Sequence, residues 1–266
     1  RYAPNLGLDP AFSVLDRGDA ADVIDVTRHD LGLTKKSRRF PKKDTCLAIY
    51  SRCVNSQQDL EPVLAESYPW CVDWEAELRE LFRGYVARKQ HHMALDYDDL
   101  LLYWNHLVAD AELGGEIGSW FDHVLVDEYQ DTNHVQYMIV KSLAADNENL
   151  CVVGDDAQSI YAFRGANIRN ILNFKKDYPD HNIFKLEQNY RSTKNIVNAA
   201  NSVIEKNKTK LEKEIWTSNE EGGKIKVMRT FSEGDEGRFI ASSIFDNKMQ
   251  NQLQNRSFTV LYRTNE

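Results

Sequence analysis

The first part of the chain carries apolar side chains at helical spacing. Between residues 74 and 85 they recur every three or four positions, which places them on one face of a helix. Residues 96–108 show the same spacing, and residues 15–32 predict a further helix that ends near Gly32. No convincing strand pattern occurs before residue 115, so this part is predicted to be helical throughout.

The pattern changes near residue 115, where Gly114, Gly115 and Gly118 interrupt the helical spacing. Short apolar runs then alternate with stretches of helical period. Strands that are apolar throughout and separated by helices predict a parallel sheet covered on both faces. The predicted strands are 123–128, 149–155, 182–188, 224–230 and 258–264, and the predicted helices between them are 132–146, 167–178, 192–207 and 233–249.

Acidic and amide side chains follow the first of these strands. Asp127 and Glu128 come directly after the apolar run, and Gln130 and Asp131 follow them. In doubly wound sheets, ligands bind at the carboxyl ends of the strands. A carboxylate such as Asp127 can hold Mg²⁺, and Glu128 can polarise a water for attack on a γ-phosphate. Surface turns also produce Asp-Glu pairs, so this cluster alone leaves both interpretations open.

A second polar cluster follows the strand at 149–155. The side-chain amide of Gln158 can donate and accept hydrogen bonds, so it can sense a phosphate and its attacking water. Tyr161, Phe163 and Arg164 place two aromatic rings and a cation within four residues. Single-stranded bases stack on such groups. Aromatic residues near strand ends are more often part of the core, and that alternative stays open here.

A third cluster lies between the strand at 182–188 and the next predicted helix, for which Ser192 is the expected N-cap. Arg191 in this loop can reach a γ-phosphate as an arginine finger. Its neighbour Tyr190 can stack on a purine. The alternative is an ordinary loop arginine that pairs with a carboxylate.

Together, the three clusters resemble the motifs of the UvrD/Rep/PcrA family of superfamily 1 DNA helicases. VDEYQDTN (126–133) resembles the Walker B motif, GDDAQSIYAFRGA (154–166) resembles motif III, and LEQNYRST (186–193) resembles motif IV. VLYRTNE (260–266) is similar to the opening of the next motif. The resemblance is very strong over 121–193, good to residue 266 and loose over the first hundred-odd residues.

The resemblance implies an α/β fold, with a RecA-like parallel sheet of the P-loop NTPase type flanked by helices. It implies an all-helical insertion of the first motor domain over 1–115. The later part of the first RecA-like domain would then span 116–181, and the start of a second RecA-like domain would span 182–266.

The resemblance also implies roles for individual residues. Asp127 would help to bind Mg²⁺, and Glu128 would be the catalytic base. Gln158 and Arg191 would contact the γ-phosphate of ATP, and Tyr190 would stack on the adenine. Phe163 departs from the family, which has Trp there; phenylalanine keeps a stacking face of smaller area. The implied DNA-binding residues are Tyr161, Phe163, Arg164, Arg263 and Asn265.

The function that the resemblance implies is ATP-dependent translocation on single-stranded DNA with unwinding of duplex DNA, 3′ to 5′, in repair or replication. The implied partners are single-stranded and duplex-junction DNA together with repair or replication proteins. The implied location is the cytoplasm, in association with the bacterial nucleoid.

The sequence lacks a G-x-x-x-x-G-K-[ST] phosphate-binding loop, since Gly223 and Lys224 are followed by Ile225. We therefore interpret the chain as a central fragment of a helicase and expect no ATPase activity from the chain alone. Two alternatives remain open. One is a non-catalytic DNA- or partner-binding module on a motor scaffold, and the other is a fragment of a helicase–nuclease subunit.

Charge and cysteine content refine this picture. The net charge of −8 argues weakly against nucleic acid, whereas residues 34–43 carry six basic and no acidic side chains. This run predicts a phosphate-facing patch, with a solvated loop as the alternative. The chain has no apolar run long enough to span a membrane and no signal peptide pattern at its start. The cysteines are predicted to be reduced core thiols of a cytoplasmic protein: Cys46, Cys53, Cys71 and Cys151.

Overall fold

The computed structural model describes residues 1–35 and 39–262 of the chain, with only the backbone described at Arg164. The chain forms two compact units. The first contains residues 1–185 together with 207–213, and the second contains residues 186–206 together with 214–266. Each unit is considered by itself below.

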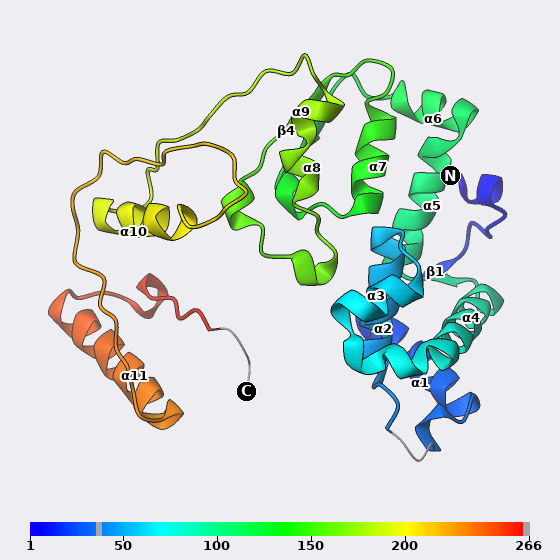
Figure 1. Ribbon diagram of the computed structural model, residues 1–266, viewed down its shortest axis with the longest axis horizontal. Coiled ribbons are helices and arrows are strands. Elements are labelled where there is room, and N and C mark those ends of the chain that lie inside the picture. Colours follow the sequence, from blue (N-terminus) through cyan, green and yellow to red (C-terminus); the bar gives the residue numbers. More distant parts are fainter. Residues whose placement is uncertain (36–38, 263–266) are drawn as a thin grey trace. The chain divides into compact units, whose positions relative to one another are not determined.

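Four helices build the largest core of the first unit: α1 (Arg17–Asp30), α2 (Lys43–Ser56), α3 (Leu60–Ser67) and α4 (Glu75–His91). They are drawn in blue to cyan in Figure 1. The side chains of Asp16 and Asp19 form a reciprocal capping box that begins α1. The helices predicted at 15–32 and 74–85 are thereby confirmed.

Three further helices follow in the first unit: α5 (Tyr97–Ala109), α6 (Ala111–Gly118) and α7 (His134–Leu143). They share a smaller core formed by residues such as Val108, Ile117 and Val135. The expectation that no strand precedes residue 115 is wrong, because β1 (Ser13–Val14) pairs in parallel with β2 (Ala94–Leu95). Strands of two residues are too short to give a readable alternation in sequence.

The strands β3 (Val124–Val126) and β4 (Leu150–Val152) pair in parallel, with Val124 opposite Leu150 and Val126 opposite Val152. Helix α7 connects them, so this strand–helix–strand prediction is confirmed. The prediction of cover on both faces is wrong for the part of the chain that the structure describes. Leu125, in the middle of β3, is 76% exposed, and its register partner Cys151 is exposed as well.

The helix predicted at 167–178 forms as two short helices, α8 (Arg169–Leu172) and α9 (Phe174–Asp177), which meet at Asn173. Short 3-10 helices complete the connections. They are η1 (Ala3–Leu6), η2 (Leu33–Lys35), η3 (Pro69–Trp74), η4 (Tyr129–Asp131), η5 (Asp156–Gln158), η6 (Ala162–Arg164) and η7 (Asn255–Ser257).

The second unit contains α10 (Lys194–Ile204) and α11 (Glu233–Gln250), close to two of the predicted helices. Helix α10 has Thr193 as its N-cap, not the predicted Ser192. The strands predicted at 182–188, 224–230 and 258–264 do not form among the described residues, where only Gln188 pairs with Trp216 in an isolated bridge. A strand needs a hydrogen-bonded neighbour along its length, and the described parts of these segments have at most that single bridge.

The four free cysteines differ in how far they are buried. Cys46 and Cys71 are buried and Cys53 is half-buried, so the prediction of core thiols is right for the first two. Burial raises the pKa of Cys46 to about 12, which keeps it a protonated thiol. The prediction is wrong for Cys151, which is exposed on β4. Among the described helices, none has the length and apolar character needed to cross a membrane.

A buried ion cluster joins α4 to the start of α5. Lys89 Nζ lies 2.7 Å from Asp96 Oδ2 and 2.5 Å from Asp99 Oδ2, and Tyr85 donates a hydrogen bond of 2.6 Å to Asp96. Although burial acts to raise it, the Lys89 charge and these hydrogen bonds hold the pKa of Asp96 below its usual range. Burial raises the pKa of Asp99. One ammonium therefore pairs with two carboxylates that have little access to water.

Replacement of Lys89 should test this cluster. Lys89→Met leaves two buried carboxylates without their cation, so we expect the free energy of unfolding to fall by about 3–5 kcal/mol. Urea unfolding of the chain, followed by circular dichroism, measures this difference. The exposed Lys176→Met is the matched control and should change stability by less than about 0.5 kcal/mol. Equal losses in the two variants would contradict the proposed role of Lys89.

Candidate functional site at the strand ends

The carboxyl end of β3 carries two exposed carboxylates, Asp127 and Glu128. Glu128 has a left-handed backbone, with φ 50° and ψ 41°. Non-glycine residues adopt this region at a cost of about 1–2 kcal/mol, and such residues cluster at functional sites. The Glu128 N–H donates a hydrogen bond of 2.8 Å to Asp127 Oδ1, which stabilises the turn. The strand therefore ends in a strained turn that presents both carboxylates.

Gln130 joins this turn to the loop after β4. Its side chain is fully buried, and its Nε2 donates to Glu128 Oε2 at 2.8 Å. Its Oε1 accepts a hydrogen bond of 3.0 Å from the backbone N–H of Asp155. One amide therefore links the two polar clusters that the sequence places after separate strands. The only signal in the sequence for a role of Gln130 is its position among the carboxylates of the first polar cluster.

Gly154 is required beside this amide. A Cβ at residue 154 would lie 2.7 Å from Gln130 Oε1 and 2.8 Å from Ile171 Cδ1, closer than real Cβ atoms approach. The glycine therefore permits the loop after β4 to pass close to Gln130.

Gln158 lies at the end of η5 and donates from Nε2 to Asp155 Oδ2 at 2.8 Å. Asp155 Oδ1 also accepts the N–H of Ala157 at 3.0 Å and pairs with Lys213. Although burial acts to raise it, the hydrogen bonds from Lys213 and Gln158 lower the pKa of Asp155. The predicted phosphate sensor Gln158 is therefore held by the carboxylate of Asp155, for which the sequence predicts no role.

The aromatic side chains of the second cluster lie on the surface. Tyr161 is exposed and Phe163 is 68% exposed, with their ring centroids 6.0 Å apart, which argues against the core alternative. Arg52 of α2 donates from Nη1 at 2.8 Å to the carbonyl of Ala162, which lies between Tyr161 and Phe163 in the sequence. The predicted DNA contact Arg164 lies on this turn, but its side chain is outside the described part of the chain.

Helix α2 also reaches the acidic cluster through a buried asparagine. Asn55 Oδ1 accepts a hydrogen bond of 2.8 Å from Asn133, which caps α7 directly after the β3 turn. Asn55 Nδ2 donates to Asp98 Oδ1 at 2.7 Å. Arg52 and Asn55 thus support the two clusters from one helix. Sequence reasoning missed both residues because their partners are 110 and 78 positions away along the chain.

The third cluster belongs to the second unit. Tyr190 is 77% exposed and donates from its hydroxyl to Gln188 Oε1 at 2.8 Å. Asn189 Oδ1 accepts the backbone N–H of Arg191 at 2.9 Å, which fixes the loop. Arg191 is exposed and forms no ion pair with a described carboxylate, so the paired-loop alternative is not supported. The predicted DNA contacts Arg263 and Asn265 lie outside the described residues.

The donor set at β3 suits a magnesium ion held largely by phosphate and water. Among the described residues, no group of three His, Cys, Asp or Glu side chains could hold a metal ion by itself. Asp131 Oδ1 is nevertheless buried without a hydrogen-bond partner in the described chain. Burial raises the pKa of Asp131, and the charge of Glu128 acts in the same direction. Mg²⁺ commonly takes one or two carboxylates and completes its shell with phosphates and water.

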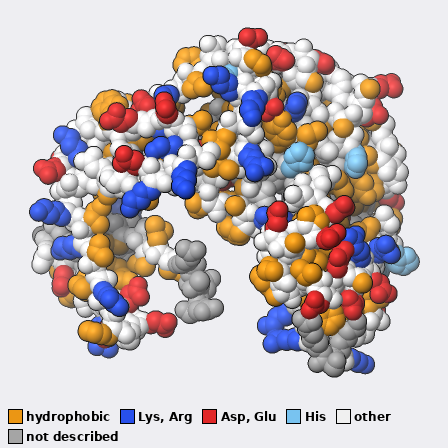
Figure 2. Space-filling view, viewed as in Figure 1, with side chains coloured by type: hydrophobic (Ala, Val, Ile, Leu, Met, Phe, Trp, Pro, Cys, Tyr) orange, Lys and Arg blue, Asp and Glu red, His pale blue; other side chains and the backbone are white. Residues whose placement is uncertain are grey.

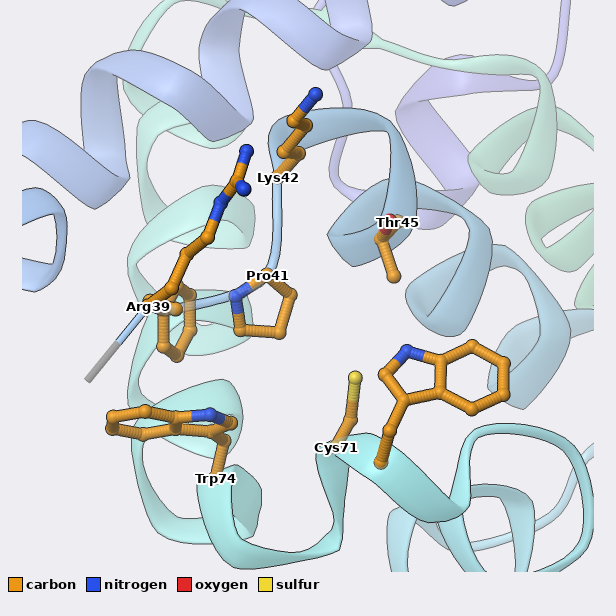
Figure 3. Close-up of a pocket in the computed structure, with 8 residues that line it drawn as sticks. Arg39, Pro41, Lys42, Thr45, Cys71 and Trp74 are labelled. Atoms are coloured by element: carbon orange, nitrogen blue, oxygen red, sulfur yellow. The ribbon is translucent and has the colours of Figure 1, made fainter.

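The basic run at 34–43 borders an open pocket of about 140 Å³ on the first unit, at the start of α2 (Figure 3). Phe40 packs edge-on against Trp74, with centroids 5.3 Å apart, and Trp70 is exposed. The side chains of Arg39 and Lys42 extend away from the rings. In Figure 2, a few blue side chains lie at the lower right, over this end of the first unit, with red side chains close by. Residues 36–38 of the run lie outside the described chain.

This geometry defines an α/β protein with a candidate ligand site at the carboxyl edge of a parallel strand pair. The chain belongs to the UvrD/REP helicase family. The family model of the UvrD/REP helicase N-terminal domain matches residues 1–179, and that of the UvrD-like helicase C-terminal domain matches residues 184–266. These domains imply a RecA-like fold. They also confirm the helicase family that the three motifs resemble.

Several curated relatives match nearly the whole chain. The "ATP-dependent DNA helicase PcrA" of Bacillus subtilis (strain 168) is 38% identical over 266 residues, covering 100% of this chain and 35% of the relative. The protein of that name from Staphylococcus aureus (strain Mu50 / ATCC 700699) is 37% identical over 268 residues, covering 100% and 36%. That of Leuconostoc citreum is 38% identical over 263 residues, covering 98% and 34%. The chain thus spans about a third of the length of these relatives.

Two glycine substitutions should shift stability in opposite directions. Gly154→Ala forces Gln130 or Ile171 to move, so we expect a loss of about 1–3 kcal/mol in the free energy of unfolding. Gly115→Ala lies in α6 with open space around the new Cβ and should stabilise the chain by about 0.5–1 kcal/mol. Urea unfolding of both variants measures the difference. A stabilising Gly154→Ala would show that Gln130 is not held against the loop.

Proposed function

We propose that the longer protein containing this chain is an ATP-dependent translocase on single-stranded DNA that unwinds duplex DNA. The observation that carries the proposal is the hydrogen-bonded link from Glu128 through Gln130 to the Asp155–Gln158 loop. Membership of the helicase family and the printed names of the relatives support it.

We further propose the domain layout that the motifs imply. Residues 1–115 are the helical insertion of the first motor domain, residues 116–181 are the later part of its RecA-like core, and residues 182–266 begin a second RecA-like domain. The parallel β3–α7–β4 arrangement supports the central assignment. The helical character of the preceding residues supports the first.

In this proposal, the β3 turn performs hydrolysis. Asp127 helps to hold Mg²⁺, which when bound neutralises charge on the ATP phosphates. Glu128 accepts the proton of the attacking water. Gln130 holds Glu128 Oε2 by its amide and leaves the other carboxylate oxygen for the proton. The strained backbone at Glu128 aims the carboxylate at the water.

The remaining contacts complete the proposed cycle. Gln158 and Arg191 contact the γ-phosphate, and Tyr190 stacks on the adenine. The exposed rings of Tyr161 and Phe163 take single-stranded bases, for which base–ring stacking supplies about 1–3 kcal/mol each. Further DNA contacts come from Arg164, Arg263 and Asn265. The partners are single-stranded and duplex-junction DNA with repair or replication proteins, movement is 3′ to 5′, and the location is the cytoplasm near the nucleoid.

Removal of the proposed arginine finger should separate hydrolysis from DNA binding. In the longer protein, Arg191→Ala should lower kcat for ATP hydrolysis by about 10³-fold or more, because the transition-state charge loses its cation. The measurement is ATPase activity with and without single-stranded DNA, alongside DNA binding, which should be unchanged. The exposed Arg229→Ala is the control in the same unit. Normal turnover by Arg191→Ala would remove this residue from the mechanism.

Reversal of charge in the basic run should weaken DNA binding. Lys35, Arg38 and Lys42 changed together to Glu should lower the affinity of the chain for DNA and flatten its salt dependence. The slope of log K against log[salt] should fall by about 2–3 if each residue meets a phosphate. The matched control changes three exposed lysines elsewhere, Lys141, Lys175 and Lys176, to Glu, so net charge changes equally. Equal effects in both variants would indicate a solvated loop and a net-charge effect.

A further inference from the structure

The segment 207–213 lies late in the sequence but belongs to the first unit. The residues before and after it belong to the second unit. Within this segment, the Leu211 N–H donates to Asp156 Oδ2 at 3.0 Å. Lys213 Nζ pairs with both Asp155 and Asp156. The segment is therefore fastened to the loop after β4 by one backbone donor and one ammonium.

The pairing of Lys213 is shielded from water. The Asp156 side chain is only 3% exposed, and the side chains of Lys213 and Asp155 are also largely covered. Although burial acts to lower it, hydrogen bonds to both carboxylates raise the pKa of Lys213. Such a pair is worth more than a surface ion pair, and removal of one partner leaves carboxylates without compensation.

Asp155 carries this support to Gln158. Its Oδ1 meets Lys213, and its Oδ2 accepts the Gln158 Nε2 hydrogen bond of 2.8 Å. The backbone N–H of the same residue is held by Gln130 at 3.0 Å. Asp155 is thus fixed at its backbone by the β3 side and at its carboxylate by Lys213. A fixed carboxylate holds the Gln158 amide in one orientation, with its nitrogen toward Asp155.

We propose that Lys213 is a positioning residue for ATP hydrolysis: through Asp155 it fixes the orientation of the Gln158 amide. The inference rests on the proposed function, because it requires Gln158 to contact the γ-phosphate and its attacking water. Without Lys213, the Asp155 carboxylate loses its neutralising partner and turns toward solvent. The Gln158 amide then loses its fixed acceptor and adopts several orientations, of which few suit hydrolysis.

The test compares Lys213→Ala, Lys213→Arg and Gln158→Ala in the longer protein with saturating single-stranded DNA. Misplacement of a catalytic group by about 1 Å costs up to about 10²-fold in rate, so Lys213→Ala should lower kcat roughly 10- to 100-fold. The KM for ATP should stay within about twofold, because the role is in the chemical step. Lys213→Arg should restore most of kcat, since a guanidinium can pair with both carboxylates.

Double substitution separates positioning from general damage. In the Gln158→Ala background, Lys213→Ala should lower kcat no further, because both changes act on the same amide. A structural role would give additive losses and a lower midpoint of thermal unfolding without rescue by arginine. Lys208→Ala, an exposed lysine of the same segment, is the control and should leave kcat unchanged.

The outcomes distinguish this inference from the proposed function. A wild-type protein without ATPase activity, or full activity of Gln158→Ala, overturns both the role of Gln158 and the inference. An active wild type with an impaired Gln158→Ala and a normal Lys213→Ala overturns the inference alone. Additive losses in the double variant also overturn it.

Discussion

The candidate site depends on one buried side-chain amide. A buried amide costs free energy unless its donor and acceptor are satisfied, and Gln130 has no access to water. Its nitrogen finds Glu128 and its oxygen finds the backbone of Asp155. This constraint sets the distance between the β3 turn and the loop after β4. It also explains why residue 154 has no side chain.

Support for the site comes from distant parts of the sequence. Helix α2 holds the aromatic turn through Arg52 and the start of α7 through Asn55, and the 207–213 segment holds Asp155 through Lys213. The contacts act on the backbone carbonyl of Ala162, the side-chain amide of Asn133 and the carboxylate of Asp155, and not on the reacting end of a predicted functional side chain. The segments that carry the functional side chains are therefore fixed by groups from elsewhere in the unit.

Sequence reasoning succeeded where local pattern determines the outcome. The helical spacing of α1 and α4, and the apolar runs of β3 and β4 on either side of α7, are local signals, and the structure confirms them. Strands at 182–188 and 224–230 failed because a strand depends on a neighbour that periodicity cannot supply. The roles of Arg52, Asn55 and Lys213 were invisible for a related reason. Their partners Ala162, Asn133 and Asp155 lie 110, 78 and 58 positions away, and a single sequence holds no trace of such pairs.

Charge divides the acidic residues of the two strand ends into two kinds. Asp155 and Asp156 share the Lys213 ammonium, which neutralises one of their two negative charges within the unit. Asp127, Glu128 and Asp131 form no ion pair with a described cation, and the raised pKa of Asp131 reflects burial and the neighbouring charge of Glu128. Like charges held close together favour the binding of a proton or a cation. The β3 turn is therefore the part of the site that favours binding of an external cation. The loop after β4 already pairs with Lys213 of the same unit.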